Sequence, residues 1–528
     1  MASEFSRREF LATLGPATVA FAAPWRQLAA VGSTASSLST GPEYSTATEL
    51  LSALQEKRVS SVELVDFAIA RIEALDPKIN AVVVRDFERA RAAAKEADAA
   101  LARGERRPLL GVPMTVKEQF NVAGLPTTWG NPKFKDWRPD ADALAVQRLK
   151  AAGAIVIGKT NVPFMLSDEQ SYNEIYGTTN NPWDLSRTPG GSSGGGAAAV
   201  AAGFVPLEFG SDLGGSLRNP AHFCGVFSHK PSLDLVPWRG AGPPQTPAWP
   251  ARSDTGGFLP QVIGPIARSA TDLALELSVV AGPDELTEGI GYKLALPPTR
   301  HERLSDFRVL VIDEHPLCPT AASVSGALND LAQRLGKAGC TVAHDHPELP
   351  DLALTSRALA QLVSAFFGAL MSQRERERIE AAAKALSPDD QSLGACFLRG
   401  RTMSHADWVH QSFIRDASRA RWRALFQDVD VVLCPPMPTV AFPHDHSSPQ
   451  YARKLDIDDH TVPYDDQIVW VGMATLNGLP ATTMPIGHSD SGLPIGVQII
   501  GGYLEDHTTI AFAGMIEREF GGFTAPPI

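Results

Sequence analysis

The stretch GGSSGGGAAAV at residues 190–200 constrains the fold more than any other part of the chain. So many glycines and serines cannot build a core, so they form either a flexible linker or a place where main chain closely approaches another group. A linker is disfavoured because AAAVAAG continues as a helix that ends at Gly203. An apolar strand, FVPLEFG, follows, and then a second glycine–serine turn centred on Ser216. One helix and one strand can therefore bring both serine turns to one edge of a sheet.

Short apolar segments alternate with helical segments along the rest of the chain. LLGVPMTVKEQF at 109–120 carries Lys117 near its end, and FRVLVID at 307–313 precedes a helix expected at about 321–338. Strands that alternate with helices are typical of sheets whose two faces are both covered. The sequence therefore predicts the α/β class, with a large mixed, mostly parallel β-sheet covered by helices on both faces.

A single catalytic domain is expected over residues 46–528, after a Ser/Thr/Gly-rich linker at 33–45. Three segments interrupt the strand–helix pattern and are predicted to be surface insertions, near 236–261, 350–425 and 440–466. Since specificity on α/β scaffolds resides largely in loops, we expect these insertions to shape the substrate pocket.

The N-terminal residues 1–32 resemble a twin-arginine export signal, with Arg7 and Arg8 ahead of the uncharged run LATLGPATVAFAA. This predicts a bacterial protein that is exported to the periplasm or beyond by the twin-arginine export machinery. The alternative is a cytoplasmic protein whose N-terminal segment is a short helix docked on the domain. A stable membrane anchor is not expected, because such a span needs roughly 20 apolar residues.

Composition argues against several classes of partner. The net charge is −12 and no basic stripe is present, which disfavours nucleic acid as a ligand. The five cysteines lack C-x-x-C spacing, so neither a zinc site nor a disulfide framework is indicated. HDH at 444–446 and DIDDH at 456–460 are interpreted as solvated loops. No metal and no cofactor are expected, and the predicted ligand is a small molecule.

The first glycine–serine turn also matches G-x-S-x-G, with either Ser192 or Ser193 at its centre, as in the nucleophile elbow of α/β-hydrolases. That interpretation is weak because it needs an acid and a histidine later in the chain, and no histidine stands out. A phosphate-binding P-loop is disfavoured as well, since no lysine follows the glycines.

Residues 190–232, GGSSGGGAAAVAAGFVPLEFGSDLGGSLRNPAHFCGVFSHKPS, are similar to the signature of the amidase signature family of serine hydrolases. The resemblance extends from about residue 45 to 525 and includes the strand with Lys117. Departures from the family pattern are few: Glu118 stands where aspartate is common, and Ser211 and Leu213 replace threonines that are more frequent in the second turn. Before Lys230, FSHKPS stands where a small residue and a leucine are common. These differences bear on substrate preference.

The resemblance implies a Ser-Ser-Lys triad with Ser216 as the acylated nucleophile, Ser192 as a proton relay after a cis peptide bond from Gly191, and Lys117 as the base. It places the oxyanion hole at the main-chain N–H groups of four residues: Leu213, Gly214, Gly215 and Ser216. Supporting roles are expected for Ser193, as a loop-stabilising hydroxyl that could also contact the relay, and for Asp212 and Arg218, which would hold the second turn. The candidate substrate-binding residues are Trp129, Met165 and Tyr172.

Elementary chemistry is consistent with this assignment. A serine hydroxyl needs a base that takes its proton as the new bond forms. Lysine can be that base only when neutral, which burial among apolar side chains favours by lowering its pKa. Lys117 lies among Val112, Met114, Val116 and Phe120 in the sequence. Ser192 would then return the proton to the departing nitrogen.

The expected function is hydrolysis of a linear carboxylic amide to a carboxylate and ammonia or an amine. Three alternatives remain open at this stage. The same triad serves an esterase or carbamate hydrolase; the family also includes the glutaminase subunit of tRNA-dependent amidotransferases; and a binding protein without activity could retain the fold.

Overall fold

The computed structural model describes residues 42–244, 260–369 and 371–528, and the segment from Pro42 to Ile528 forms one compact unit. The predicted export signal at 1–32 and most of the predicted linker lie outside the described residues, as does the middle of the insertion near 236–261. The end of the predicted linker is part of the folded unit, because it contains the 3-10 helix η2 (Pro42–Tyr44), and Arg268 Nη2 donates a hydrogen bond of 2.5 Å to the carbonyl of Ser45.

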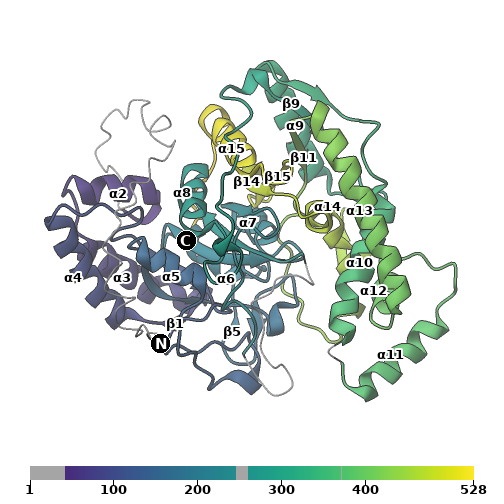
Figure 1. The fold of residues 1–528 in the computed structure, drawn as a ribbon, viewed down its shortest axis with the longest axis horizontal. Helices are drawn as coiled ribbons and strands as arrows, with labels where there is room; N and C mark the ends of the chain where they lie inside the picture. The colour runs from purple at the N-terminus through teal and green to yellow at the C-terminus, as the bar shows by residue number, and fades with distance from the viewer. Residues whose placement is uncertain (1–41, 245–259, 370) are drawn as a thin grey trace, which may run out of the picture. The chain divides into compact units, whose positions relative to one another are not determined.

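Eleven strands form one sheet that runs through the molecule (Figure 1). In spatial order they are β1 (Val82–Arg85), β3 (Ile155–Thr160), β2 (Pro113–Lys117), β6 (Leu207–Asp212), β8 (Val262–Ala267), β7 (Phe227–Lys230), β14 (Ala481–His488), β15 (Pro494–Ile500), β11 (Val431–Cys434), β9 (Arg308–Val311) and β10 (Thr341–Ala343).

The predicted large mixed sheet is confirmed, but parallel pairs are the minority within it. Only β3–β2, β2–β6, β11–β9 and β9–β10 pair in parallel, and every other neighbouring pair in the sheet is antiparallel. The expectation of a mostly parallel sheet was wrong in this respect. One reason is visible in β14 and β15, which are joined by only five residues, 489–493, too few for the crossover that parallel pairing requires.

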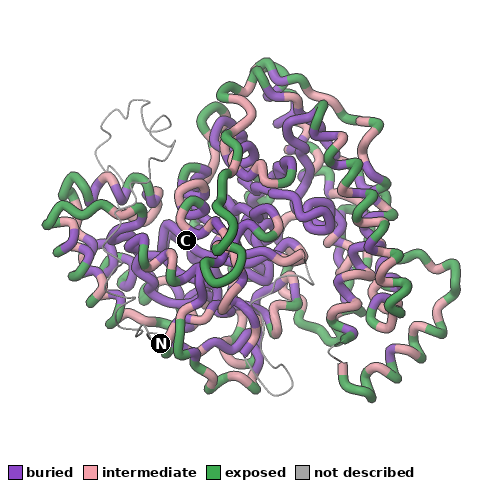
Figure 2. The backbone as a smooth tube through the Cα atoms, in the orientation of Figure 1, coloured by how far each residue is buried: buried purple, intermediate pink, exposed green. Residues whose placement is uncertain are grey.

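Helices cover both faces of the sheet because alternate strand residues point to opposite sides. Val431 and Leu433 enter one hydrophobic core, whereas Val432 and Cys434 enter another. Figure 2 shows the buried interior that results. The first face carries α2 (Ala47–Gln55), α5 (Leu144–Ala151), α8 (Ala270–Val280), α9 (Ala322–Lys337) and α15 (Asp506–Phe520).

The opposite face is covered by two groups of helices. Near β1, β3, β2 and β6 lie α3 (Ser61–Ile79), α4 (Phe87–Ala102) and α6 (Gly194–Ala201), whereas α7 (Arg218–Cys224) packs beside α6 and against β7, β14 and β15. Near β14, β15, β11 and β9 lie α10 (Leu352–Ala369), α12 (Leu393–Gly400), α13 (His405–Asp428) and α14 (Val469–Asn477). Among the described helices, α10 is long and apolar enough to cross a membrane by length and composition alone, and 44% of it is buried inside the protein.

Two predicted insertions have their own secondary structure. The segment near 350–425 forms α10, α11 (Gln373–Ala385), α12 and most of α13, which group at the right of Figure 1. The segment near 440–466 contains η7 (Gln450–Ala452), the antiparallel pair β12 (Lys454–Ile457) and β13 (His460–Pro463), and the start of η8 (Tyr464–Ile468). A second small pair, β4 (Tyr172–Asn173) and β5 (Gly177–Thr178), lies earlier in the chain.

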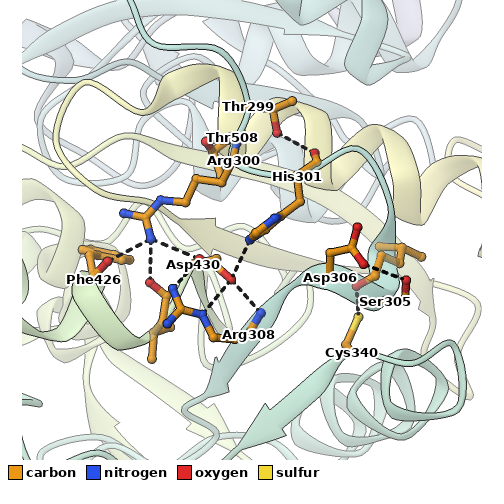
Figure 3. Close-up of polar contacts among 12 residues, drawn as sticks. Thr299, Arg300, His301, Ser305, Asp306, Arg308, Cys340, Phe426, Asp430 and Thr508 are labelled. Carbon is orange, nitrogen blue, oxygen red and sulfur yellow. Dashed lines mark hydrogen bonds and ion pairs between the residues drawn. The ribbon is translucent and has the colours of Figure 1, made fainter.

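An ionic cluster around Asp430 ties the start of β11 to the start of β9 (Figure 3). The Asp430 carboxylate accepts hydrogen bonds from Arg308 Nη2 at 2.8 Å and from Arg300 Nη1 at 3.1 Å, and His301 Nε2 lies 3.2 Å from it. Burial by itself raises the pKa of Asp430, but the bonds from Arg308 and Arg300 outweigh it and lower the pKa to about 2.

Replacing Asp430 by asparagine is expected to lower the free energy of unfolding at pH 7 by about 1–2 kcal/mol, a value reduced for solvent screening of the arginines. The stabilising effect of the carboxylate is complete above its ordinary pKa of 3.8 and is lost as the pH falls toward 2. Urea unfolding of wild type and variant from pH 7 down to pH 2 measures the difference, which should shrink over that lower range. Asp306→Asn, which removes an exposed pair with Arg303, is the control and should have a smaller effect. Equal losses in the two variants would contradict this account.

Candidate active site

Lys117 ends β2 and is completely buried. Met114 and Val116 of the same strand enter the core on the first face of the sheet, so Lys117 points toward the opposite face, where α6 lies. Its Nζ donates hydrogen bonds to Ser192 Oγ at 2.7 Å and to Ser211 Oγ at 3.0 Å. The strand therefore delivers one amine to two hydroxyl groups.

Burial is the main influence on the ionisation of Lys117. Removal from water lowers its pKa from 10.5 to about 7, against opposing effects of the carboxyl groups of Asp212, Glu208 and Glu169. Near neutral pH a large fraction of the amine is therefore uncharged, which is the state that can accept a proton.

The first glycine–serine turn places Ser192 against this amine. The peptide bond between Gly191 and Ser192 is cis, as the resemblance implied. A side chain at Gly191 would lie 2.4 Å from the carbonyl oxygen of Asp168, so only glycine fits there. The Ser193 hydroxyl donates to the carbonyl of Ser211 at 3.2 Å, which matches its expected role in stabilising the loop.

The second turn, residues 213–216, joins β6 to α7 and is held by a buried ion pair. Asp212 and Arg218 are both fully buried, with Arg218 Nη2 2.7 Å from Asp212 Oδ1. The Asp212 carboxylate also accepts the N–H groups of Gly215 at 3.0 Å and Leu217 at 3.1 Å. Asp212 and Arg218 thus hold the turn, as expected.

This arrangement corrects one predicted member of the oxyanion hole. The N–H of Gly215 is already bonded to Asp212, so it is not free for a substrate oxygen. The N–H groups of Leu213, Gly214 and Ser216 have no acceptor within the described part of the chain. These three remain as the donors available at the turn.

The two turns lie against each other, since the N–H of Ser193 donates to the carbonyl of Ser216 at 3.2 Å. Within the described ranges, no hydrogen bond joins the side chains of Ser192 and Ser216, and the Ser216 hydroxyl has no partner. Ser216 is 8% exposed, whereas Ser192 and Lys117 are almost completely buried.

The expected substrate-binding residues are placed differently from one another. Tyr172 belongs to a network with the 440–466 insertion: its hydroxyl donates to Asp168 and accepts from Arg453, and its ring stacks on His446. These contacts fix the position of Tyr172, and its role in substrate binding stays a prediction. Trp129 and Met165 are adjacent, and the main-chain N–H of Met165 donates a hydrogen bond of 2.7 Å to the carbonyl oxygen of Trp129. Trp129 is largely buried, whereas Met165 is partly exposed.

Sequence reasoning missed the role of Ser211. In the sequence this residue stands out only as a departure from the family pattern, yet its hydroxyl accepts from Lys117 and donates to Gln119 Oε1 at 2.5 Å. Its position on the strand next to β2, beside Asp212, was the available signal.

The cysteines are buried free thiols, and within residues 42–244, 260–369 and 371–528 no group of three or more histidine, cysteine or acidic residues could hold a metal ion.

Comparison with known proteins identifies the family to which this chain belongs. The Amidase family matches residues 63–510. The chain is 34% identical over 494 residues to the A subunit of glutamyl-tRNA(Gln) amidotransferase from Anaeromyxobacter dehalogenans (strain 2CP-C), covering 89% of this chain and 95% of that protein.

Solved structures give the same result. An inhibitor-bound protein from a vestigial complex that reveals the evolutionary origins of an s-triazine catabolic enzyme has a TM-score of 0.75 and 28% identity, over 90% of this chain and 99% of that one. A bacterial aryl acylamidase of the amidase signature enzymes has a TM-score of 0.74 and 25% identity, over 90% and 96%. This chain therefore belongs to the amidase signature family and is an amide-hydrolysing enzyme.

Proposed function

We propose that this protein hydrolyses a carboxylic amide to a carboxylate and ammonia or an amine, through an acyl-enzyme on Ser216, with Lys117 as base and Ser192 as proton relay. The observation that carries the proposal is the contact of 2.7 Å between the fully buried Lys117 Nζ and Ser192 Oγ. Only a desolvated amine of lowered pKa can serve as a base near neutral pH.

Ser211 orients this base. Because its own proton is donated to Gln119, the Ser211 hydroxyl can only accept at Lys117. One N–H of the neutral Lys117 amine is thereby directed at Ser211, and its lone pair remains available to Ser192. Ser211 and Gln119 are thus positioning residues for proton transfer.

The proposed reaction has two halves. Ser216 Oγ attacks the amide carbon while its proton passes to Ser192 and that of Ser192 passes to Lys117. The developing oxyanion accepts hydrogen bonds from the free N–H groups of Leu213, Gly214 and Ser216. The proton then returns through Ser192 to the nitrogen, the carbon–nitrogen bond breaks and the amine leaves. Water attacks the acyl-enzyme by the same proton route and releases the carboxylate.

Ser216→Ala is expected to lower kcat by at least about 10⁴-fold with an unchanged circular dichroism spectrum, because it removes the atom that forms the acyl bond. Intact-protein mass spectrometry after brief mixing with an activated amide should show an acyl adduct on the wild type and none on Ser216→Ala. Ser193→Ala, which changes the neighbouring hydroxyl of the first turn, should still form the adduct. Unchanged turnover in Ser216→Ala would contradict the proposal.

Activity should rise with pH through about 7, because Lys117 accepts a proton only after it has lost its own. The measurement is kcat/KM between pH 5 and pH 9 on an amide and on the corresponding ester. Lys117→Ala should remove this rise and impair the amide far more than the ester, since an amine leaving group needs the returned proton. Equal impairment of both substrates would instead favour the esterase or carbamate hydrolase alternative.

A second candidate is the glutaminase subunit of a tRNA-dependent amidotransferase, which is favoured by the name of the glutamyl-tRNA(Gln) amidotransferase relative. The same site chemistry would release ammonia from glutamine. The expected export signal at residues 1–32 argues against it, because export would separate the chain from tRNA.

The isolated chain distinguishes the two candidates. The amidase proposal predicts turnover of simple aliphatic or aryl amides by the purified protein alone, measured as release of ammonia or amine, with Ser216→Ala as the blank. If glutamine were the only amide hydrolysed, and if its hydrolysis required added partner subunits, the amidase proposal would be contradicted and the second candidate established.

A further inference from the structure

A carboxyl group lies beside the second turn, on the open side of Gly214. A side chain built at Gly214 would come 3.2 Å from Ile468 Cδ1 and 3.8 Å from Glu169 Oε1. Gly214 and Glu169 are both partly exposed. Glu169 therefore lies beside Gly214, one of the three residues whose N–H groups are proposed to bind the oxyanion.

Glu169 is held in this position from two sides. Asn219 Nδ2, from the first turn of α7, donates a hydrogen bond of 2.6 Å to Glu169 Oε2. The main chain of Glu169 packs on the other turn, since a side chain at Gly191 would lie 2.7 Å from its carbonyl carbon. Across the described ranges, no protein donor contacts Oε1, which faces Gly214.

The charge of Glu169 is not balanced by a neighbouring cation. Asp168 is paired with Arg453 and Asp212 with Arg218, whereas Glu169 has no ion pair within the described part of the chain. Burial, reinforced by Asp168, Asp212 and Asp465, raises the pKa of Glu169 well above its ordinary value, although the bond from Asn219 opposes this. The site on its own therefore favours the uncharged acid, and a positive charge beside Oε1 would stabilise the ionised carboxylate instead.

An ionised carboxylate at this place without a cation would also oppose catalysis. Negative charge develops on the substrate oxygen in the transition state, and a nearby anion raises the energy of that state. A cation bound to Glu169 would cancel this repulsion. Because none of the described residues supplies one, the substrate is the natural source.

We propose that Glu169 recognises an ammonium group on the substrate, which makes the substrate class an amine-bearing amide; this inference rests on the proposed function. The ammonium group would donate a charge-assisted hydrogen bond to Oε1. Two apolar side chains are partly exposed here for the rest of such a substrate: Leu213, which packs against α10, and Ile468, which lies beside Gly214.

The test compares ω-amino aliphatic amides of increasing chain length, together with glutamine, against uncharged amides of matching length. Glu169→Gln keeps the shape of the side chain and an oxygen for Asn219 while removing the charge. It is expected to lower kcat/KM for the best ammonium-bearing amide by at least about ten-fold, mainly through KM, and to leave kcat/KM for the uncharged amides unchanged or higher, because the variant also removes the charge that would oppose the oxyanion. Glu174→Gln, an exposed acid of the same segment without a hydrogen bond in the described structure, is the matched control and should change neither.

The outcomes separate the two claims. Equal effects of Glu169→Gln on charged and uncharged amides, or a wild-type preference for the uncharged series, would overturn the role of Glu169 and leave the proposed amidase intact. Absence of Ser216-dependent turnover on both series would overturn the proposed function, and this inference with it.

Discussion

The contact between Lys117 and Ser192 inside the protein is the interaction on which the proposed chemistry depends. An exposed lysine is charged at neutral pH and cannot accept a proton, so the amine has to be taken out of water. The fold achieves this by ending a fully buried strand at Lys117 and packing α6 over it. Glycine is needed at 191 because the main chain of residues 168–170 passes directly over that turn.

Two buried basic side chains at the site, Arg218 and Lys117, have different partners, and this difference explains their roles. Arg218 is paired with Asp212, and this ion pair fixes the shape of the second turn. Lys117 has only hydroxyl partners within the described structure, so burial dominates and its pKa falls to about 7. A fully buried ion pair adds little net stability, so its role here is to fix geometry. The Asp212 carboxylate accepts the N–H of Gly215, whereas the N–H groups of Gly214 and Ser216 stay free in the described structure. The proposed role of Glu169 follows from the same reasoning. This acid has no cationic partner in the described structure, so a positively charged group of the substrate would be its partner.

Much of the fold could be predicted from local signals. The apolar runs LLGVPMTVKEQF and FRVLVID contain the strands β2 and β9, and the helix expected at about 321–338 is α9. The 190–232 signature supplied the two serine turns and the cis bond at Gly191. Strand direction was less predictable, because the antiparallel pairing of β7 with β14 joins segments far apart in the sequence, which no local pattern encodes. For the same reason the sequence did not predict three other contacts of the site, each between residues far apart in the chain. Ser211 contacts Lys117 from a different strand, Tyr172 contacts Arg453 of an insertion, and Glu169 contacts Asn219, which is 50 residues further along.

The central claim is that the Lys117 amine loses its proton near neutral pH, and direct titration tests it best. Lysine labelled with ¹³C at Cε gives a signal for each side chain whose shift follows ionisation, and Lys117→Arg identifies the signal that belongs to Lys117. The account predicts a midpoint at about pH 7 for that signal. A midpoint close to 10.5, the ordinary value for lysine, would show that Lys117 stays charged and cannot be the base.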